Sequence, residues 1–118
     1  MKSSSLLEIA NLLLPEVLVN YFDLTSHKIK GEELHFYFKE KNEQPEEYSL
    51  SKLSSKGFYP EAVVQDFPIR GKQVYLHITR RRWTNEASKQ AVFRNWQLVA
   101  QGTRMTNDFA TFLKEISR

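Results

Sequence analysis

The chain has 118 residues, of which 41% are hydrophobic, and it contains no cysteine. This length and composition suit one globular domain over residues 1–118, and the lack of cysteine excludes disulfides, thiol catalysis and cysteine-ligated zinc. The net charge is +3 but is distributed unevenly, since all seven arginines lie between Arg70 and Arg118. A basic C-terminal half points towards a polyanionic partner, and the alternative is a surface that is basic without binding one.

The N-terminal stretch shows no targeting or membrane signal. No apolar run approaches the roughly 18 residues of a membrane-spanning helix. The stretch contains Glu8 and Asn11 and lacks the small-residue cleavage site of a signal peptide. We therefore expect a cytoplasmic protein without a membrane partner.

Two helices are predicted at the start of the chain. Ser5 and Glu8 have the spacing of a capping box, and an apolar stripe of helical period follows them up to Pro15. Pro15 can then open a second, short helix that ends near Tyr21 or Phe22. The apolar stripes predict packing against a core and not a ligand site.

The next element is a predicted β-hairpin over residues 24–39, with Gly31 in its turn. In its second arm, apolar and polar residues alternate from Leu34 to Lys39, which indicates one buried face. The polar segment 40–57 is expected to be a loop with at most one helical turn.

A second hairpin is predicted next, with one arm over residues 62–67, a turn over 68–72 and a second arm over 73–83. A further strand is expected over residues 91–100. Thr106 can cap a final helix, with Asp108 in its first turn. The spacing of four apolar residues predicts one buried stripe on that helix, formed by Phe109, Phe112, Leu113 and Ile116.

The order of these elements predicts an α+β fold, with N-terminal helices, antiparallel β-hairpins that form a small sheet, and a C-terminal helix. We find no internal repeat of fixed period in the sequence.

The end of the second hairpin is unusual because three consecutive arginines precede Trp83. Since side chains alternate along a strand, Val74, Leu76 and Ile78 should share the core face. If the pairing persists to the end of the arm, the outer face carries an aromatic and basic row, formed by Tyr75, His77, Thr79, Arg81 and Trp83.

Arg80 and Arg82 are expected to extend beyond the sheet into solvent. A ribbon with such a row can enter a major groove, where arginine reaches phosphate or guanine. The alternative is a charged edge that prevents strand-to-strand aggregation.

Other chemistry is sparse in this sequence. In the first hairpin His27 should lie opposite Phe36, and His35 opposite Lys28, so the two histidines face opposite ways and should not share a metal. There is no glycine-rich phosphate loop, no acid–base pair of carboxylates and no nucleophile arrangement. We therefore expect no enzyme activity, no metal and no cofactor.

The stretch "VVQDFPIRGKQVYLHITRRRWTN" resembles a segment of certain bacterial insertion-sequence transposases, whose N-terminal domain carries a zinc finger. The shared features are an aspartate before Pro68, a Gly71-Lys72 turn, alternating apolar residues and an Arg-Arg-aromatic end. The family's cysteine pairs would fall within "SLSKLSSKG" and near Thr84 and Ala87, where this chain has none. The whole chain therefore looks like a cysteine-free variant of this N-terminal region.

The resemblance implies a DNA-binding module that recognises the ends of an insertion element and has no catalytic domain. One alternative is an interaction domain that assembles with a separate catalytic transposase subunit. Another is single-stranded nucleic-acid binding with Tyr75 and Trp83 as a stacking platform. The sequence leaves the oligomeric state open. The residues expected to contact double-stranded DNA are Arg70, Lys72, Tyr75, His77, Arg80, Arg81, Arg82, Trp83, Arg94 and Arg104.

Overall fold

The computed structural model of the chain describes residues 14, 16–96 and 106–116. The predicted first helix lies outside these residues, as does Arg104. The predicted second helix is confirmed as α2 (Glu16–Tyr21). Within the described residues, no helix is long and apolar enough to cross a membrane.

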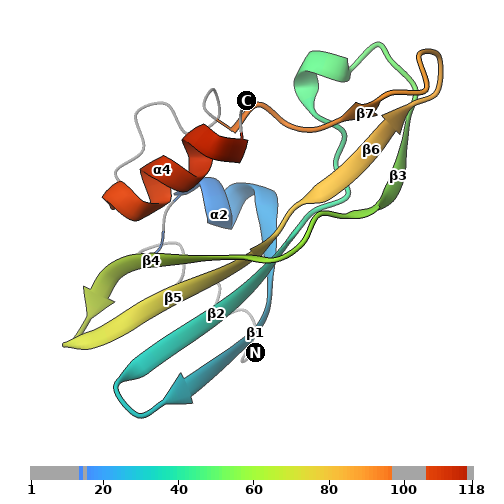
Figure 1. Cartoon of the computed structure of the whole chain (residues 1–118). Coiled ribbons are helices and arrows are strands. Elements are labelled where there is room, and N and C mark those ends of the chain that lie inside the picture. The colour runs from blue at the N-terminus through green and yellow to red at the C-terminus, as the bar shows by residue number, and fades with distance from the viewer. Residues whose placement is uncertain (1–13, 15, 97–105, 117–118) are drawn as a thin grey trace.

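The first of two sheets has four strands in the order β1-β2-β5-β4 (Figure 1). Both predicted hairpins are present in it, but β2 and β5 pair in parallel, so the hairpins lie side by side with their turns at the same end. Gln73 N donates to Glu32 O between the two turns, at 2.9 Å. The strands are β1 (Phe22–Lys30), β2 (Glu33–Glu40), β4 (Ala62–Ile69) and β5 (Lys72–Thr79).

The second sheet has the order β3-β6-β7. Its strands are β3 (Leu53–Phe58), β6 (Arg81–Asn85) and β7 (Ala91–Val92). The α+β class is confirmed, but the prediction of a single antiparallel sheet is wrong. The predicted loop over 40–57 contains η1 (Glu46–Tyr48), which is the expected helical turn, and also β3. β3 has no alternating apolar pattern, and it is a strand because it pairs with the distant β6.

The predicted arm over residues 73–83 is divided into two strands that belong to different sheets. β5 ends at Thr79 and β6 begins at Arg81. At the break, Tyr59 N donates to the carbonyl of Arg80 at 2.8 Å. The carboxylate of Glu40 accepts a hydrogen bond from Arg81 N at 2.9 Å. The chain therefore leaves the first sheet because partners outside β4 bind the backbone at this point.

The turn between β4 and β5 is tighter than predicted. It consists of Arg70 and Gly71, with φ angles of 51° and 78°, instead of the expected segment 68–72. Two successive positive φ angles are typical of the type I′ turn, which matches the twist of a hairpin. Arg70 therefore lies at an exposed tip in a conformation that a non-glycine residue seldom adopts.

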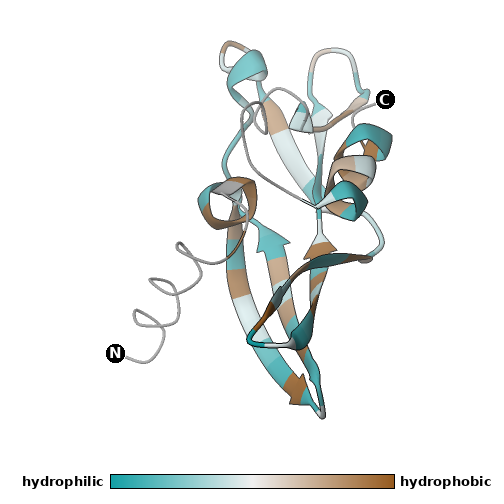
Figure 2. Ribbon diagram, turned by 90° about the vertical axis from the view of Figure 1, so that its left-hand side faces the viewer, coloured by the Kyte–Doolittle hydropathy of each residue, from teal (hydrophilic) through white to brown (hydrophobic). Residues whose placement is uncertain are grey.

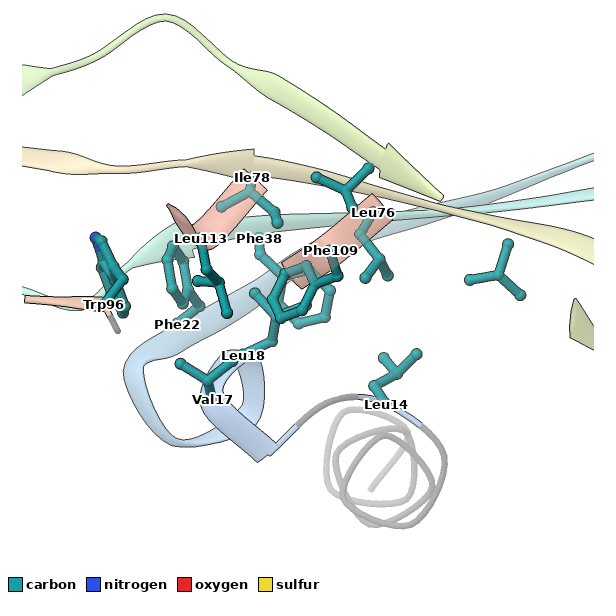
Figure 3. Packing of buried hydrophobic residues seen from close by; sticks show 12 residues of the cluster. Leu14, Val17, Leu18, Phe22, Phe38, Leu76, Ile78, Trp96, Phe109 and Leu113 are labelled. Carbon is teal, nitrogen blue, oxygen red and sulfur yellow. The ribbon is translucent and has the colours of Figure 1, made fainter. Parts of the chain in front are cut away.

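Both described α-helices pack on one face of the four-stranded sheet. Hydrophobic and hydrophilic residues alternate along the strands (Figure 2), so only one face supplies the core. The predicted core residues of β5 are confirmed, since Val74, Leu76 and Ile78 are fully buried. Figure 3 shows the strand residues Phe22, Phe38, Leu76 and Ile78 packed with residues of both helices and of the segment after β7, which are Val17, Leu18, Trp96, Phe109 and Leu113.

The C-terminal helix, α4 (Asn107–Ile116), forms as predicted. Thr106 Oγ1 accepts a hydrogen bond from Phe109 N at 3.1 Å, which is the expected cap. Phe109 and Leu113 are buried, and the other two residues of the predicted stripe pack at the border of the core. Asp108 Oδ2 accepts a hydrogen bond from Gln65 N at 2.7 Å, so the start of α4 also seals the edge of β4.

The predicted strand over residues 91–100 is confirmed only for Ala91–Val92. Trp96 leaves the extended path and enters the core, where its ring stacks on Phe22 at a centroid distance of 5.1 Å. Residues 97–100 lie outside the described part of the chain.

Candidate nucleic-acid interface

The face of the four-stranded sheet opposite α2 and α4, here called the outer face, has no described helix over it (Figure 1). The alternation of β2 and β5 places aromatic and titratable side chains on this face. Because β2 and β5 are parallel and in register, His35 lies beside Tyr75, and Tyr37 lies beside His77. The outer face is therefore built from both hairpins.

These four residues form a tyrosine–histidine block. The rings of His35 and Tyr75 stack at 5.1 Å, and those of Tyr37 and His77 stack at 4.2 Å. His35 Nδ1 lies 2.8 Å from His77 Nε2, so one hydrogen bond joins the two pairs. Rings that stack on one another have little free face left for a nucleobase. The block is consequently a poor stacking platform, although Tyr37, Tyr75 and His77 are partly exposed.

Two carboxylates flank the histidines. His35 Nε2 lies 2.9 Å from Glu33 Oε1, and His77 Nδ1 lies 3.1 Å from Glu61 Oε1. The two histidine side chains are only 11% and 12% exposed, whereas both glutamates are 46% exposed. A continuous chain of three hydrogen bonds therefore crosses the outer face from β2 to the residue before β4.

A row of lysines and aromatic rings runs beside this block. Lys28 Nζ lies 6.0 Å from the ring centre of Tyr37, and Lys39 Nζ lies 4.9 Å from that of Phe58. Arg81 also reaches Phe58, at 4.7 Å. Neither lysine forms an ion pair with any residue of the described ranges. Both ammonium groups are therefore available to an anion.

Arg81 and Arg94 are both bound by one buried residue, Glu40. Arg94 Nε lies 3.3 Å from Glu40 Oε2, and both side chains are at most 5% exposed. The guanidinium of Arg81 donates to the carbonyl oxygen of Glu40 and to Ser55 Oγ. Burial raises the pKa of Glu40, and the hydrogen bond from Arg81 N and the charge of Arg94 oppose that rise. These two arginines thus hold the two sheets together.

Arg80 does not extend into solvent as expected. Its guanidinium packs over Tyr59 at 4.6 Å, and burial lowers its pKa. Its Nε is buried without a hydrogen-bond partner among the described residues. For Arg82 only the exposure is confirmed: it lies within β6 of the second sheet and not beyond a sheet end, and its exposed side chain donates from Nη2 to the carbonyl of Lys56 at 3.0 Å.

The predicted outer row from Tyr75 to Trp83 is wrong beyond Thr79, because β6 belongs to the other sheet. Trp83 is 2% exposed and Arg94 is 4% exposed, and both are part of the junction around Glu40. Trp83 therefore cannot serve as a stacking platform on this surface.

The remaining predicted site residues lie in three places. Tyr75 and His77 are on the outer face, as predicted. Arg70 is at the exposed β4–β5 turn, and Lys72 follows it with its Nζ 3.7 Å from Glu32. Arg104 lies outside the described residues.

Sequence reasoning missed the part of the outer face that comes from the first hairpin. The predicted registers of His27 with Phe36 and of His35 with Lys28 are confirmed, but the contact of His35 with His77 was not foreseen. The alternation around Tyr37 carried the signal that these residues share a face. Only the parallel pairing of β2 with β5 brings them to the second hairpin.

Comparison with protein-family models, with curated proteins and with solved structures finds no match for this chain. Over the described ranges, no group of three or more histidine, cysteine or acidic side chains is arranged to hold a metal ion. The functional argument therefore depends on the surface itself.

Proposed function

We propose that this protein is a non-catalytic DNA-binding module of an insertion-sequence transposition system, and that its outer face meets the DNA backbone. The observation that carries the proposal is a pair of lysines, Lys28 and Lys39, that have no ion-pair partner among the described residues and lie beside aromatic rings on a face that neither α2 nor α4 covers. Lysine ammonium groups on long flexible stems neutralise phosphates without regard to base sequence.

The hairpin turns extend this surface at one end. Both turns project from the same end of the sheet, and Lys30, Arg70 and Lys72 lie at or beside them. The nearby acid Glu32 is already offset by Lys72. Basic residues at one end of a sheet face that neither α2 nor α4 covers add to the kind of electrostatic footprint that a duplex backbone requires.

The exposed arginines are the best candidates for base contacts. Arg81 is occupied by Glu40 and Ser55, so its guanidinium fork is not available. Arg82 and Arg70 are exposed, and Arg82 uses one of its donors on Lys56. A forked contact from such an arginine to guanine contributes about 1–3 kcal/mol to discrimination between bases.

The transposition context draws support from the second sheet. The two places where the resembling family has cysteine pairs fall on β3 and at the end of β6, and these strands are neighbours here, with Ser54 beside Thr84. Ordinary hydrogen bonds occupy this position: Ser54 donates to Glu86, and Glu86 N donates to Lys52 O at 2.9 Å. This arrangement is consistent with a zinc-finger position whose ligands have been replaced by polar contacts.

The proposal is tested with a double variant, Lys28→Gln/Lys39→Gln, in fluorescence-anisotropy titrations of a duplex at several salt concentrations. We expect weaker binding to all duplexes and a salt slope that is flatter by about 1.8, because each lost phosphate contact removes about 0.9. Lys114→Gln is the matched control, since Lys114 is an exposed lysine on α4, on the opposite side of the sheet. Unchanged affinity and slope in the double variant would exclude the outer face as the DNA surface.

A second candidate function is assembly with a separate catalytic subunit. Val63 and Phe67 of β4 are 54% and 48% exposed, which is high for apolar residues of this size. Both side chains share the outer face with His77 and Tyr75, but neither is charged, so replacing both by serine should leave the salt slope of DNA binding unchanged under the first proposal. The same change should abolish a pull-down of the element's catalytic subunit under the second.

A further inference from the structure

The hydrogen bonds across the outer face have an unusual proton requirement. Glu33, His35, His77 and Glu61, here called the Glu–His–His–Glu chain, are joined by three contacts of 2.9, 2.8 and 3.1 Å. Ionised carboxylates only accept hydrogen bonds, so the ring nitrogens that face the two glutamates must each carry a hydrogen. Two neutral imidazoles have two hydrogens in all, and both are used by these contacts.

The contact between the two rings then lacks a hydrogen. With both hydrogens directed at the glutamates, His35 Nδ1 and His77 Nε2 would present two lone pairs to each other at 2.8 Å. Moving one hydrogen to this contact would leave a carboxylate oxygen against a lone pair instead. A fourth hydrogen would set two N–H groups head to head. Three hydrogen bonds therefore require three hydrogens, which is one more than the neutral count.

We propose that the Glu–His–His–Glu chain holds one shared proton and that this proton regulates polyanion binding at the outer face; the second part rests on the proposed function. Among side chains, histidine is the general physiological-pH switch, which makes a histidine pair a suitable place for a regulatory proton. With the proton the four side chains carry a net charge of −1, and without it −2. A polyanion on this face favours the protonated form.

The surroundings of the Glu–His–His–Glu chain shield the two imidazoles from solvent but leave the two glutamates partly exposed, so a shared proton can still exchange with water. The two described α-helices, α2 and α4, lie on the other side of the sheet, and Tyr37 and Tyr75 stack on the two imidazoles. Lys28 lies over the ring of Tyr37, which stacks on His77. The charged or titratable groups that share the outer face around the two histidines are Glu33, Glu61, Lys28, Lys30, Lys39, Asp23, Tyr37 and Tyr75, with Lys30 beside Glu33 and Asp23 beside Lys39 in the β1–β2 register.

Proton loss should also alter the geometry of the face. Without the third hydrogen the two facing nitrogens repel each other, so His77 moves and the ring of Tyr37 stacked on it at 4.2 Å must follow. Tyr37 is the ring beside Lys28. The proton therefore affects both the charge of the outer face and the position of one of its lysines.

The first arm of the test counts the hydrogens without DNA. Long-range ¹H–¹⁵N NMR of the histidine rings at pH 6.5 should show three nitrogen-bound hydrogens shared by His35 and His77. Two neutral tautomers would overturn the shared proton. A spectrum that changes on treatment with a chelator would also overturn it, because a metal ion would then lie between the two nitrogens.

The second arm measures duplex affinity from pH 6 to 8.5 at constant ionic strength. Affinity should fall as the pH rises, by at most about tenfold per pH unit for one linked proton, and His35→Gln/His77→Gln should remove this dependence. His27→Gln is the matched control, since His27 is an exposed histidine of the same sheet on the opposite face. An unchanged pH slope in the double variant would overturn the regulation.

Two further outcomes separate the inferences. If the double variant does not fold by circular dichroism, Glu61→Gln replaces it, because the new amide oxygen can still accept from His77 while one negative charge is lost. That variant should keep three hydrogens and bind DNA more tightly, and weaker or equal binding would count against the regulation. If the wild type binds no duplex at any pH, the proposed function and the regulation both fail, and NMR alone decides the shared proton.

Discussion

The basic residues of this protein divide into those that stabilise the fold and those that are free to bind. A buried charge needs a partner, because its lost hydration is otherwise uncompensated. Arg94 satisfies this requirement through the carboxylate of Glu40, and the guanidinium of Arg81 donates to the carbonyl oxygen of Glu40 and to Ser55 Oγ, whereas Lys28 and Lys39 remain beside aromatic rings at the surface. Whether a basic side chain is available to DNA therefore depends on the protein acceptors within its reach and not on its charge alone.

Asp66 provides a test of electrostatics at a single residue. It is buried, its Oδ1 has no hydrogen-bond partner in the described part of the chain, and burial raises its pKa. A carboxyl group whose pKa is raised by folding adds stability below its ordinary pKa, and this is lost as the pH rises through the raised value. Above about pH 4 the unfolding free energy of the wild type should therefore fall as the pH rises, and Asp66→Asn should reduce that fall.

Urea denaturation over a pH series measures this effect. The slope of unfolding free energy against pH should be smaller in Asp66→Asn but not zero, because the raised pKa of Glu40 contributes in the same direction. Asp23→Asn, at an exposed position of β1, is the control. An Asp66→Asn slope equal to that of the wild type would show that another group is responsible.

At the scale of elements, α4 closes the core and covers the edge of β4. Phe109 is completely buried, while Phe112 is only partly buried at the border of the core. Phe109→Ala should lower the unfolding free energy by about 3–5 kcal/mol, and Phe112→Ala should lower it by less. Chemical denaturation with exposed Thr111→Ala as control measures both changes. Equal effects of the two phenylalanines would contradict the packing of this helix.

Local elements could be predicted from the sequence, but the pairing between them could not. The two hairpins, the short α2 and the Thr106 cap follow from turn residues, alternation and helical spacing. The parallel β2–β5 contact joins residues about forty positions apart, and no local pattern specifies it. For the same reason the outer-face positions of Tyr75 and His77 were predictable, whereas their contacts with β2 were not.

The break at Arg80 is the other feature that the local pattern could not reveal. A continuous strand predicts that Arg81 and Trp83 stay on the outer face, but the hydrogen bond from Arg81 N to Glu40 diverts the chain. Glu40 is at the end of β2, 41 residues away from Arg81 in sequence. Sequence patterns therefore predicted where the β5 residues of the candidate site lie, but not where the β6 residues lie.

For the whole molecule, the important feature is the junction between the two sheets. Arg94 lies among Tyr21, Trp83 and Trp96, at 4.7, 5.9 and 5.7 Å from their ring centres, and pairs with Glu40 at the end of β2. Its Nη2 also donates to the carbonyl of Glu43 at 2.6 Å. One guanidinium thus connects α2, both sheets and the loop after β2.

Replacing Arg94 should therefore destabilise the protein in a pH-dependent way. Arg94→Met keeps much of the volume but leaves the Glu40 carboxylate buried without its cation, which costs about 3–5 kcal/mol. Loss of Arg94 removes an interaction that opposes the rise in the pKa of Glu40. Protonated Glu40 needs no cation, so the penalty should be largest near pH 7 and smaller near pH 4.5. Urea unfolding at the two pH values measures the difference, and Arg82→Met, at an exposed arginine of β6, is the control. A penalty that is equal at both pH values would show that Arg94 stabilises the junction through its aromatic contacts and not through the charge of Glu40.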